Sequence, residues 1–259
     1  MLLITEALLL ILAALGQDHR AAAGQIFPLD MELNSVDDYY YGCREKMAHL
    51  VKTKYLKKEI NNSAKFKYYW QNSENIVKFP KDHLTRNHLT AIYVYSDTNV
   101  YHHFNLDTRK GKNQYKHKTY KWYALHFLLT EAIQILKKTQ NKCYLTYRGT
   151  TAEFNKYVLN KEVRFGSFAS SSLNPNVARN FGTKSCFEIY TCESAELTKY
   201  SKYPHEKEVL IPPYETFKVT AVRTKTYQQN LWCDTVYTLK SSGRRSDLNC
   251  ALFKKPFKY

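Results

Sequence analysis

The hydrophobic pattern changes character about halfway along the chain. Residues 120–139, YKWYALHFLLTEAIQILKKT, carry apolar side chains at helical spacing and lysines in the last turn, where cations favour a helix C-terminus. We predict a helix there. Residues 37–60 are rich in helix formers and open with Asp37 and Asp38, which are favoured at helix N-termini, so a further helix is predicted over them. The HLTAIYVYS segment between these two fits a helix or a strand.

Short strands are predicted in the second half, where β-branched and aromatic runs are separated by Gly, Pro, Asn and Ser. The predicted strands cover residues 142–149, 184–192, 208–213, 216–227 and 234–241. Helices first and strands later indicate an α+β fold rather than a regular βαβ alternation. We therefore expect one domain over residues 24–259, with a helical N-terminal part packed on a C-terminal β-core.

The two ends of the chain predict where the protein is found. Residues 1–16 are largely apolar but are interrupted by polar residues from Gln17 onward, too early for a membrane span of roughly 20 residues. This pattern predicts a signal peptide over residues 1–23, cleaved between 16 and 24, although Glu6 and the lack of a basic start depart from the usual form. The C-terminal NCALFKKPFKY has no hydrophobic tail of the kind that a glycolipid anchor requires. The expectation is a secreted, extracellular protein without a transmembrane segment.

Six cysteines behind a signal peptide favour disulfides. No C-x-x-C pair occurs and the gaps between cysteines are unlike zinc spacings, so no metal site is expected. Cys43 and Cys250 would join the two ends of the mature chain if they paired. The sequon at Asn61 fits the same compartment.

Charge and composition narrow the class of protein further. Hydrophobic residues make up 44% of the chain and aromatic residues 15%, which excludes a disordered protein. Lys and Arg outnumber Asp and Glu by 39 to 23, giving a formal charge of +16. A secreted protein this basic is expected to adhere to acidic glycans, anionic membranes or nucleic acid. The charge is dispersed along the chain and by itself indicates no activity.

Two polar features interrupt the predicted strands. Arg148 ends a hydrophobic strand beside Gly149, which suits an anion site made of a planar donor fork and closely approaching backbone; the alternative is a surface salt bridge on an edge strand. Ser170, Ser171 and Ser172 form a hydroxyl cluster that could orient a carboxylate or bind a sugar. The alternative for the serines is a strand end followed by a helix cap in NPNVARNF.

Glu206 and Glu208 flank Lys207 where the chain turns from polar to apolar. In an extended segment residues i and i+2 point the same way, so the two carboxylates would repel unless a cation or a substrate lay between them. The alternative is a solvated charged surface. Tyr203 precedes them and Pro204 stiffens the approach, so the ring could stack on a planar group or cover the edge of the core. No G-x-S-x-G, P-loop, Rossmann or H-E-x-x-H motif occurs in the chain.

Taken in order, YRGT, VRFGSFASSSL, IYTC and EKEVLIPPYETFKV resemble the arginine-specific mono-ADP-ribosyltransferases, vertebrate ecto-enzymes related to clostridial and cholera-type toxins. The resemblance runs from YYGC to the end of the chain. It implies a split β-sheet core around an NAD cleft, with NAD as a substrate and no metal. It also implies the disulfides Cys43–Cys250 and Cys143–Cys192, and leaves open whether Cys186 and Cys233 pair.

The resemblance assigns roles to the polar residues. The family's Arg–Ser–Glu triad falls on Arg148, Ser170 and Glu208, and Glu206 is the upstream glutamate of the Glu-x-Glu motif. Arg148 would hold the pyrophosphate or the nicotinamide-side ribose, Ser170 would orient Glu208, and Glu208 would grip the ribose 2′-hydroxyl as positive charge develops. Glu206 would dock the acceptor guanidinium. The residues expected to contact NAD are Arg148, Gly149, Ser170 and Tyr203.

The expected function is transfer of ADP-ribose from NAD to arginine side chains of proteins, with release of nicotinamide. A glutamate rather than a glutamine at position 206 favours arginine as the acceptor. Two alternatives stay open: an NAD glycohydrolase that uses water as acceptor, and a catalytically silent basic secreted protein that acts by binding. Agmatine, a free guanidine, separates the first two, since only a transferase modifies it. We expect a monomer.

Overall fold

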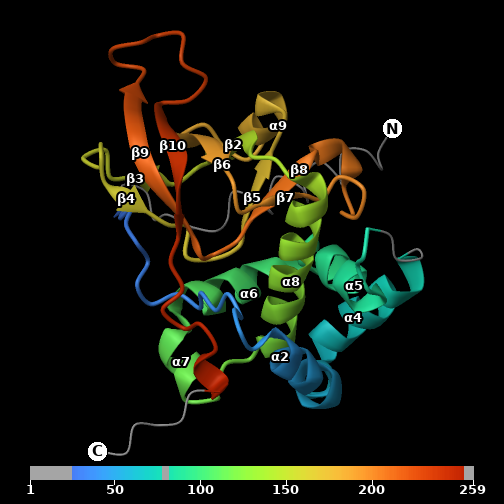
Figure 1. Ribbon diagram of the computed structural model, residues 1–259. Helices are drawn as coiled ribbons and strands as arrows, with labels where there is room; N and C mark the ends of the chain where they lie inside the picture. Colours follow the sequence, from blue (N-terminus) through green and yellow to red (C-terminus); the bar gives the residue numbers. More distant parts are fainter. Residues whose placement is uncertain (1–24, 78–81, 254–259) are drawn as a thin grey trace, which may run out of the picture.

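Helices occupy the first half of the chain and strands the second (Figure 1). The computed structural model describes residues 25–77 and 82–253, so the predicted signal peptide and the last residues of the C-terminal segment lie outside the described residues. The helices are α2 (Arg44–Leu50), the π-helical turn η1 (Val51–Tyr55), α3 (Leu56–Asn62), α4 (Ala64–Ile76), α5 (Arg86–Tyr95), α6 (Thr98–Lys110), α7 (Lys112–Lys116), α8 (Tyr123–Gln140), α9 (Pro175–Arg179) and the 3₁₀ turns η2 (Pro204–Glu206) and η3 (Ala251–Phe253).

The strands form one eight-stranded mixed sheet and a small two-stranded one. The order in the large sheet is β4-β9-β10-β6-β2-β5-β8-β7, and β1 pairs with β3 in the small one. The strands are β1 (Ile26–Phe27), β2 (Tyr144–Thr150), β3 (Glu153–Phe154), β4 (Glu162–Val163), β5 (Ala169–Ser172), β6 (Ser185–Thr191), β7 (Ala195–Glu196), β8 (Glu208–Ile211), β9 (Glu215–Thr224) and β10 (Thr235–Arg244). The predicted α+β class is confirmed.

The large sheet divides between β2 and β5. Strand β2 pairs with β6 over its whole length, whereas its pairing with β5 consists of Tyr147 opposite Ser172. Beyond that one bridge the two strands diverge, so β5, β8 and β7 form a separate half of the sheet. The split β-sheet core expected from the family resemblance is therefore confirmed.

Each half of the sheet has its own hydrophobic core. Helix α8 buries much of its length, and its core includes Leu210 of β8 and Ala195 of β7, so the helical part packs on the β5–β8–β7 half. A second core is built mainly on the other half, with Phe187, Phe217 and Tyr237, and also takes in Ala169 of β5 and Ile211 of β8. The helix predicted over 120–139 is confirmed, and the ambiguous HLTAIYVYS segment is helical, in α5.

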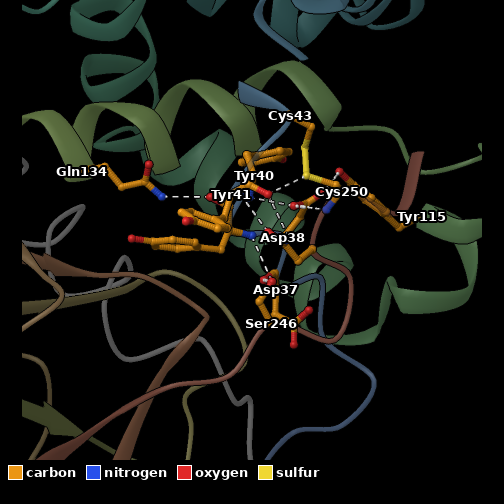
Figure 2. Close-up of a disulfide and its surroundings, with 11 residues drawn as sticks. Asp37, Asp38, Tyr40, Tyr41, Cys43, Tyr115, Gln134, Ser246 and Cys250 are labelled. Atoms are coloured by element: carbon orange, nitrogen blue, oxygen red, sulfur yellow. Dashed lines mark hydrogen bonds between the residues drawn. A yellow bond between two sulfur atoms is a disulfide. The ribbon is translucent and has the colours of Figure 1, made fainter. Parts of the chain in front are cut away.

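The helix predicted over residues 37–60 begins only at Arg44, so the prediction for Asp37 and Asp38 is wrong. Both aspartates are buried in long-range contacts (Figure 2). Asp37 forms an ion pair with buried Arg164 at 2.7 Å, and Asp38 accepts hydrogen bonds from the Tyr115 hydroxyl at 2.7 Å and the Cys250 amide at 3.0 Å. These tertiary partners, supplied by distant segments, override the local preference for a helix N-terminus.

Three disulfides are present in the described chain. Cys43–Cys250 joins the two ends of the described chain beside Asp38 (Figure 2), and Cys143–Cys192 ties the start of β2 to the end of β6. Both pairings implied by the resemblance are confirmed. Cys186 and Cys233 also pair, which answers the question that the sequence leaves open. Within the described ranges, no helix combines the length and the apolar character needed to cross a bilayer.

Candidate active site

The divergence of β2 and β5 leaves a cavity at the centre of the large sheet. Its walls come from β2, β5, α9 and the turn that leads into β8 (Figure 1). The residues that line it are Tyr147, Arg148, Gly149, Ser170, Ser171, Ser172, Val177, Ala178, Phe181, Glu206 and Glu208. The structure thus gathers Arg148, Gly149, Ser170, Glu206 and Glu208, all of which the sequence singles out.

Arg148 bridges the two halves of the sheet. Its side chain is half-buried, and Nη1 donates a hydrogen bond to the carbonyl oxygen of Ser170 at 2.7 Å, across the gap between β2 and β5. A guanidinium has five donors in a fixed plane, so this bond orients the fork within the cavity.

Gly149 is required by close packing against the chain itself. A Cβ added there would lie 2.4 Å from the carbonyl oxygens of Ala178 and Gly182, at the C-terminal end of α9. These are backbone atoms, so no side chain can rotate to make room. The absence of a side chain at Gly149 lets α9 sit against β2 and form one wall of the cavity.

Gly149→Ala is expected to lower the free energy of unfolding by about 1–3 kcal/mol, because α9 must shift away from β2. The NAD-dependent activity that the family resemblance implies is expected to fall about tenfold through displacement of the same wall. Thermal melting and nicotinamide release measure the two effects. Gly243→Ala is the control, since its added Cβ meets no atom within 4 Å, although its φ of +128° adds backbone strain. An unchanged melting temperature for Gly149→Ala would contradict the packing argument.

The three serines of β5 have three different partners. The Ser170 hydroxyl is hydrogen-bonded to the carboxylate of Glu208. Ser171 donates to the carbonyl oxygen of Val209 at 2.8 Å, and Ser172 donates to the carbonyl oxygen of Glu206 at 2.6 Å. Ser170 contacts one of the two acidic side chains, therefore, while Ser172 fixes the backbone of the other. The alternative of a strand end before a helix cap also holds, since Asn174 caps α9.

Glu208 begins β8 with only 5% of its surface exposed. Burial raises the pKa of Glu208, and hydrogen bonds from Ser170 and Ser201 and the nearby charge of Arg148 oppose that rise. These three groups stabilise the carboxylate form in a site that otherwise disfavours charge.

Glu206 also lines this cavity, but for a different reason from the strand alternation that the sequence predicts. The segment is not extended: Glu206 ends the 3₁₀ turn η2, and Lys207 has left-handed backbone with φ 48° and ψ 49°. Strand alternation therefore does not explain why the two carboxylates face one cavity; the turn geometry does. Burial, together with the charge of Glu208, raises the pKa of Glu206 to about 7.

Tyr203 precedes η2 and is half-buried. Its ring lies edge-on to His205, with 6.1 Å between centroids, and the Lys202 ammonium lies 5.5 Å from its centre. Tyr203 does not line the cavity that holds Glu206 and Glu208. The structure therefore places it on the turn beside the cavity rather than within it.

A neighbouring cavity shares Arg148 and adds two further arginines, Arg109 of α6 and Arg164, which is paired with Asp37. Arg109 Nη2 donates to the Ser167 hydroxyl at 2.8 Å, and its Nε lies 3.8 Å from a carboxylate oxygen of Glu32. Three phenylalanines from distant segments, Phe154, Phe165 and Phe187, complete the walls. No sequence pattern indicates that Arg109 belongs to a site, because it lies in a basic stretch with Lys110 and Lys112.

The acidic, histidine and cysteine side chains of the described ranges form no group of three or more that could hold a metal ion. The linings of the two cavities hold three arginines, four carboxylates, serine hydroxyls and aromatic rings.

The chain matches a known protein family over most of its length. Residues 29–245 match the family model described as NAD:arginine ADP-ribosyltransferase. The chain is 37% identical over 235 residues to NAD(P)(+)--arginine ADP-ribosyltransferase 2 of Gallus gallus, covering 87% of this chain and 73% of that protein. It is 33% identical over 240 residues to ecto-ADP-ribosyltransferase 4 of Homo sapiens, with the same coverages.

Solved structures agree with these matches. The crystal structure of the eukaryotic mono-ADP-ribosyltransferase ART2.2 superposes with a TM-score of 0.72 at 30% identity, over 88% of this chain and 100% of that one. A variant of ART2.2 in complex with NADH superposes with a TM-score of 0.73.

Proposed function

The chain belongs to the NAD:arginine ADP-ribosyltransferase family, and we propose that Arg148, Ser170, Glu206 and Glu208 carry out transfer of ADP-ribose from NAD to protein arginines. The observation that carries the proposal is that Glu206 and Glu208 line one cavity together with Arg148 and Ser170. NAD is the substrate that solved structures of the related ART2.2 hold.

The two cavities, which share Arg148 in their linings, suit the parts of NAD. Arg148 and Arg109 offer two guanidinium groups for the diphosphate, since planar donor forks bind phosphate oxygens in pairs. The phenylalanines beside them offer faces for planar rings. We propose that Gly149 contacts the substrate through its backbone on the cavity wall. Tyr203 is outside the lining, on the turn beside the cavity, and its proposed contact would have to come from there.

Glu208 is the group that stabilises the transition state. Breaking the bond between nicotinamide and ribose leaves positive charge on the ribose, as in glycoside hydrolysis. A buried carboxylate held by Ser170 and Ser201 can accept a hydrogen bond from the ribose 2′-hydroxyl, and that bond strengthens as the charge grows. Ser170 acts through Glu208, as a positioning residue.

Glu206 is the group that receives the acceptor. An arginine side chain is protonated at any ordinary pH and is a poor nucleophile in that form. The Glu206 carboxylate can bind the guanidinium, aim one nitrogen at the anomeric carbon and take its proton as the new C–N bond forms. The incoming cation also relieves the repulsion between Glu206 and Glu208.

The proposal is tested by incubating the purified, disulfide-bonded protein with NAD, with and without agmatine. A transferase converts agmatine to ADP-ribosylagmatine and releases nicotinamide in equal amount. Nicotinamide release without any adduct would make the protein a glycohydrolase. Release of no nicotinamide under either condition would overturn the enzymatic proposal.

The ratio of transfer to nicotinamide release is expected to rise with pH through about 7, the pKa of Glu206. Below that pH Glu206 is protonated and neutral and cannot bind the acceptor cation, whereas above it the carboxylate is charged. Both products require cleavage of the same bond, so a change in the charge of Glu208 alters the rates of both by the same factor and leaves their ratio unchanged. A change in the ratio therefore reports the charge of Glu206. Adduct and nicotinamide are measured from pH 5 to 9 at subsaturating agmatine.

His205→Asn is the control for this pH profile, because His205 lies in the same turn as Glu206. The rise should persist in His205→Asn. A ratio that does not change with pH, or a rise that disappears in His205→Asn, would contradict the assignment to Glu206.

We also propose an extracellular location and protein arginines as acceptors. Relatives are named ecto-ADP-ribosyltransferases, and the three disulfides suit an oxidising compartment. Secretion of the tagged full chain into culture medium tests the location.

A further inference from the structure

A cavity of about 550 Å³ lies in the helical half, far from the split of the sheet. Its walls come from α3 and α4, from α6 and from the residues that lead into α8. Helix α8 has 18 residues and so spans roughly 27 Å. The cavity lies at its N-terminal end, and β7 and β8 lie at the other (Figure 1). The proposed transferase site does not use it.

The inner wall of this cavity is a fixed set of aromatic rings. Trp122 meets Phe66 edge-on at 5.5 Å, and its Nε1 donates to Asp107 at 2.8 Å, so the indole is held on two sides. Tyr55 stacks on Tyr123 at 4.6 Å. Tyr55, Phe66 and Tyr123 are buried and form the base of the wall, whereas Trp122 is partly exposed. Because the indole is already held in place, a ligand that packs on it loses little ordering entropy of the protein.

The rim of the cavity is positively charged. Lys58, Lys65 and Lys121 line it, all exposed, and they come from segments that only the fold brings together. Further exposed lysines lie on the same segments, at positions 54, 57, 116 and 118. A cationic rim over aromatic rings selects an anion that also has an apolar face.

The cavity has two acidic side chains against three lysines, and one of the two is buried. Glu59 is buried and accepts hydrogen bonds from the backbone amides of Ala124 at 2.6 Å and Leu125 at 3.2 Å. Burial raises the pKa of Glu59 to about 8, so it carries little charge at neutral pH. Asp107 is partly exposed and remains a charged group of the lining, where it accepts the hydrogen bond from Trp122.

Neutral polar groups complete the lining. Asn62, Asn99 and Thr119 present amide and hydroxyl groups that can bond to hydroxyls of a ligand. Aromatic rings, hydroxyl partners and cations together match a sugar chain that carries sulfate groups. A lipid surface is flat and would not enter a concave site of this volume.

We propose that this cavity binds a sulfated glycan chain, with its sugar rings on Trp122 and its sulfate groups on Lys58, Lys65 and Lys121. The interaction holds the protein on the extracellular matrix or on cell-surface glycans and leaves the cleft at the split of the sheet open to substrate.

The test is binding of a heparin octasaccharide by calorimetry at 50 and 150 mM NaCl. The variant Lys58→Ala/Lys65→Ala/Lys121→Ala is expected to bind about tenfold more weakly, from three exposed charge contacts. The matched control Lys142→Ala/Lys218→Ala/Lys240→Ala removes the same charge from exposed lysines outside the cavity and is expected to stay within about twofold of wild type. Unchanged melting temperatures confirm that both variants are folded.

Trp122→Leu tests the contribution of the aromatic ring to binding separately from that of the lysines, because it removes the indole and keeps the charge. It should weaken octasaccharide binding about fivefold with little change in the salt dependence, whereas the cavity triple variant should flatten the salt dependence. Equal weakening by the two triple variants would show that net charge alone drives binding, and would overturn the proposal. Tighter cavity-dependent binding of a DNA oligonucleotide than of the octasaccharide would also overturn it.

The sequon at Asn61 supplies a further check, because Asn62 and Ser63 line the cavity. If the octasaccharide binds only to Asn61→Gln and not to the glycosylated protein, the chain's own glycan covers the site and the proposal fails for the native protein.

Discussion

Glu208→Gln is expected to lower nicotinamide release and transfer to agmatine together, by about 10²–10³-fold. Glutamine keeps the shape of the side chain and can still bond to Ser170 and Ser201, but it lacks the negative charge that faces the developing charge on the ribose. Both products depend on cleavage of the same bond, so both should fall by the same factor. Initial rates of nicotinamide and adduct formation at saturating NAD measure the loss.

Glu196→Gln is the matched control for this substitution. Glu196 lies on β7, the strand beside β8, opposite Val209, and it does not line the cavity at the split of the sheet. It should retain activity within about twofold, as expected of a substitution away from the site. Nicotinamide release by Glu208→Gln at the wild-type rate would rule out Glu208 as the transition-state group.

Glu206→Gln is expected to separate the two products. Adduct formation should fall about 10²-fold, because the amide neither attracts the guanidinium as a carboxylate does nor accepts its proton. Nicotinamide release should stay within about threefold of wild type, since Glu208, Ser170 and Arg148 are intact and water can take the place of the acceptor. The variant would then behave as a glycohydrolase.

The release of nicotinamide serves as the internal control in that experiment, because it reports the fold and the NAD site in the same sample. The pH dependence of the product ratio should also disappear in Glu206→Gln. Parallel loss of both products would instead assign Glu206 to bond cleavage, and unchanged adduct formation would remove it from acceptor binding.

Local sequence signals predict the parts of the site that depend on residue type. The run that ends in Arg148, the serines at 170–172 and the Glu-x-Glu motif can be found without a structure, because cavities that handle anions and cations need these side chains. Two of the strands that carry them, β2 and β8, are also predicted, since they are short and rich in β-formers, whereas β5 is not among the predicted strands because it consists mostly of serines.

The geometry of the site depends on contacts that a local pattern does not contain. Glu206 faces the cavity because Lys207 has left-handed backbone, a conformation uncommon for a lysine, and because Ser172 holds its carbonyl. Arg109 joins the site from α6, a helix whose sequence resembles any basic surface helix.

The sequence by itself determined the α+β class, helix α8 and most strands of the large sheet. Each of these follows from side-chain periodicity or residue type over a few positions. The tertiary structure alone decided the η2 turn, the Cys186–Cys233 pair, the partners of Asp37 and Asp38, and the raised pKa of Glu206. Asp38 shows the reason: its partner Cys250 is 212 residues away, and burial and long-range hydrogen bonds exist only once such segments meet.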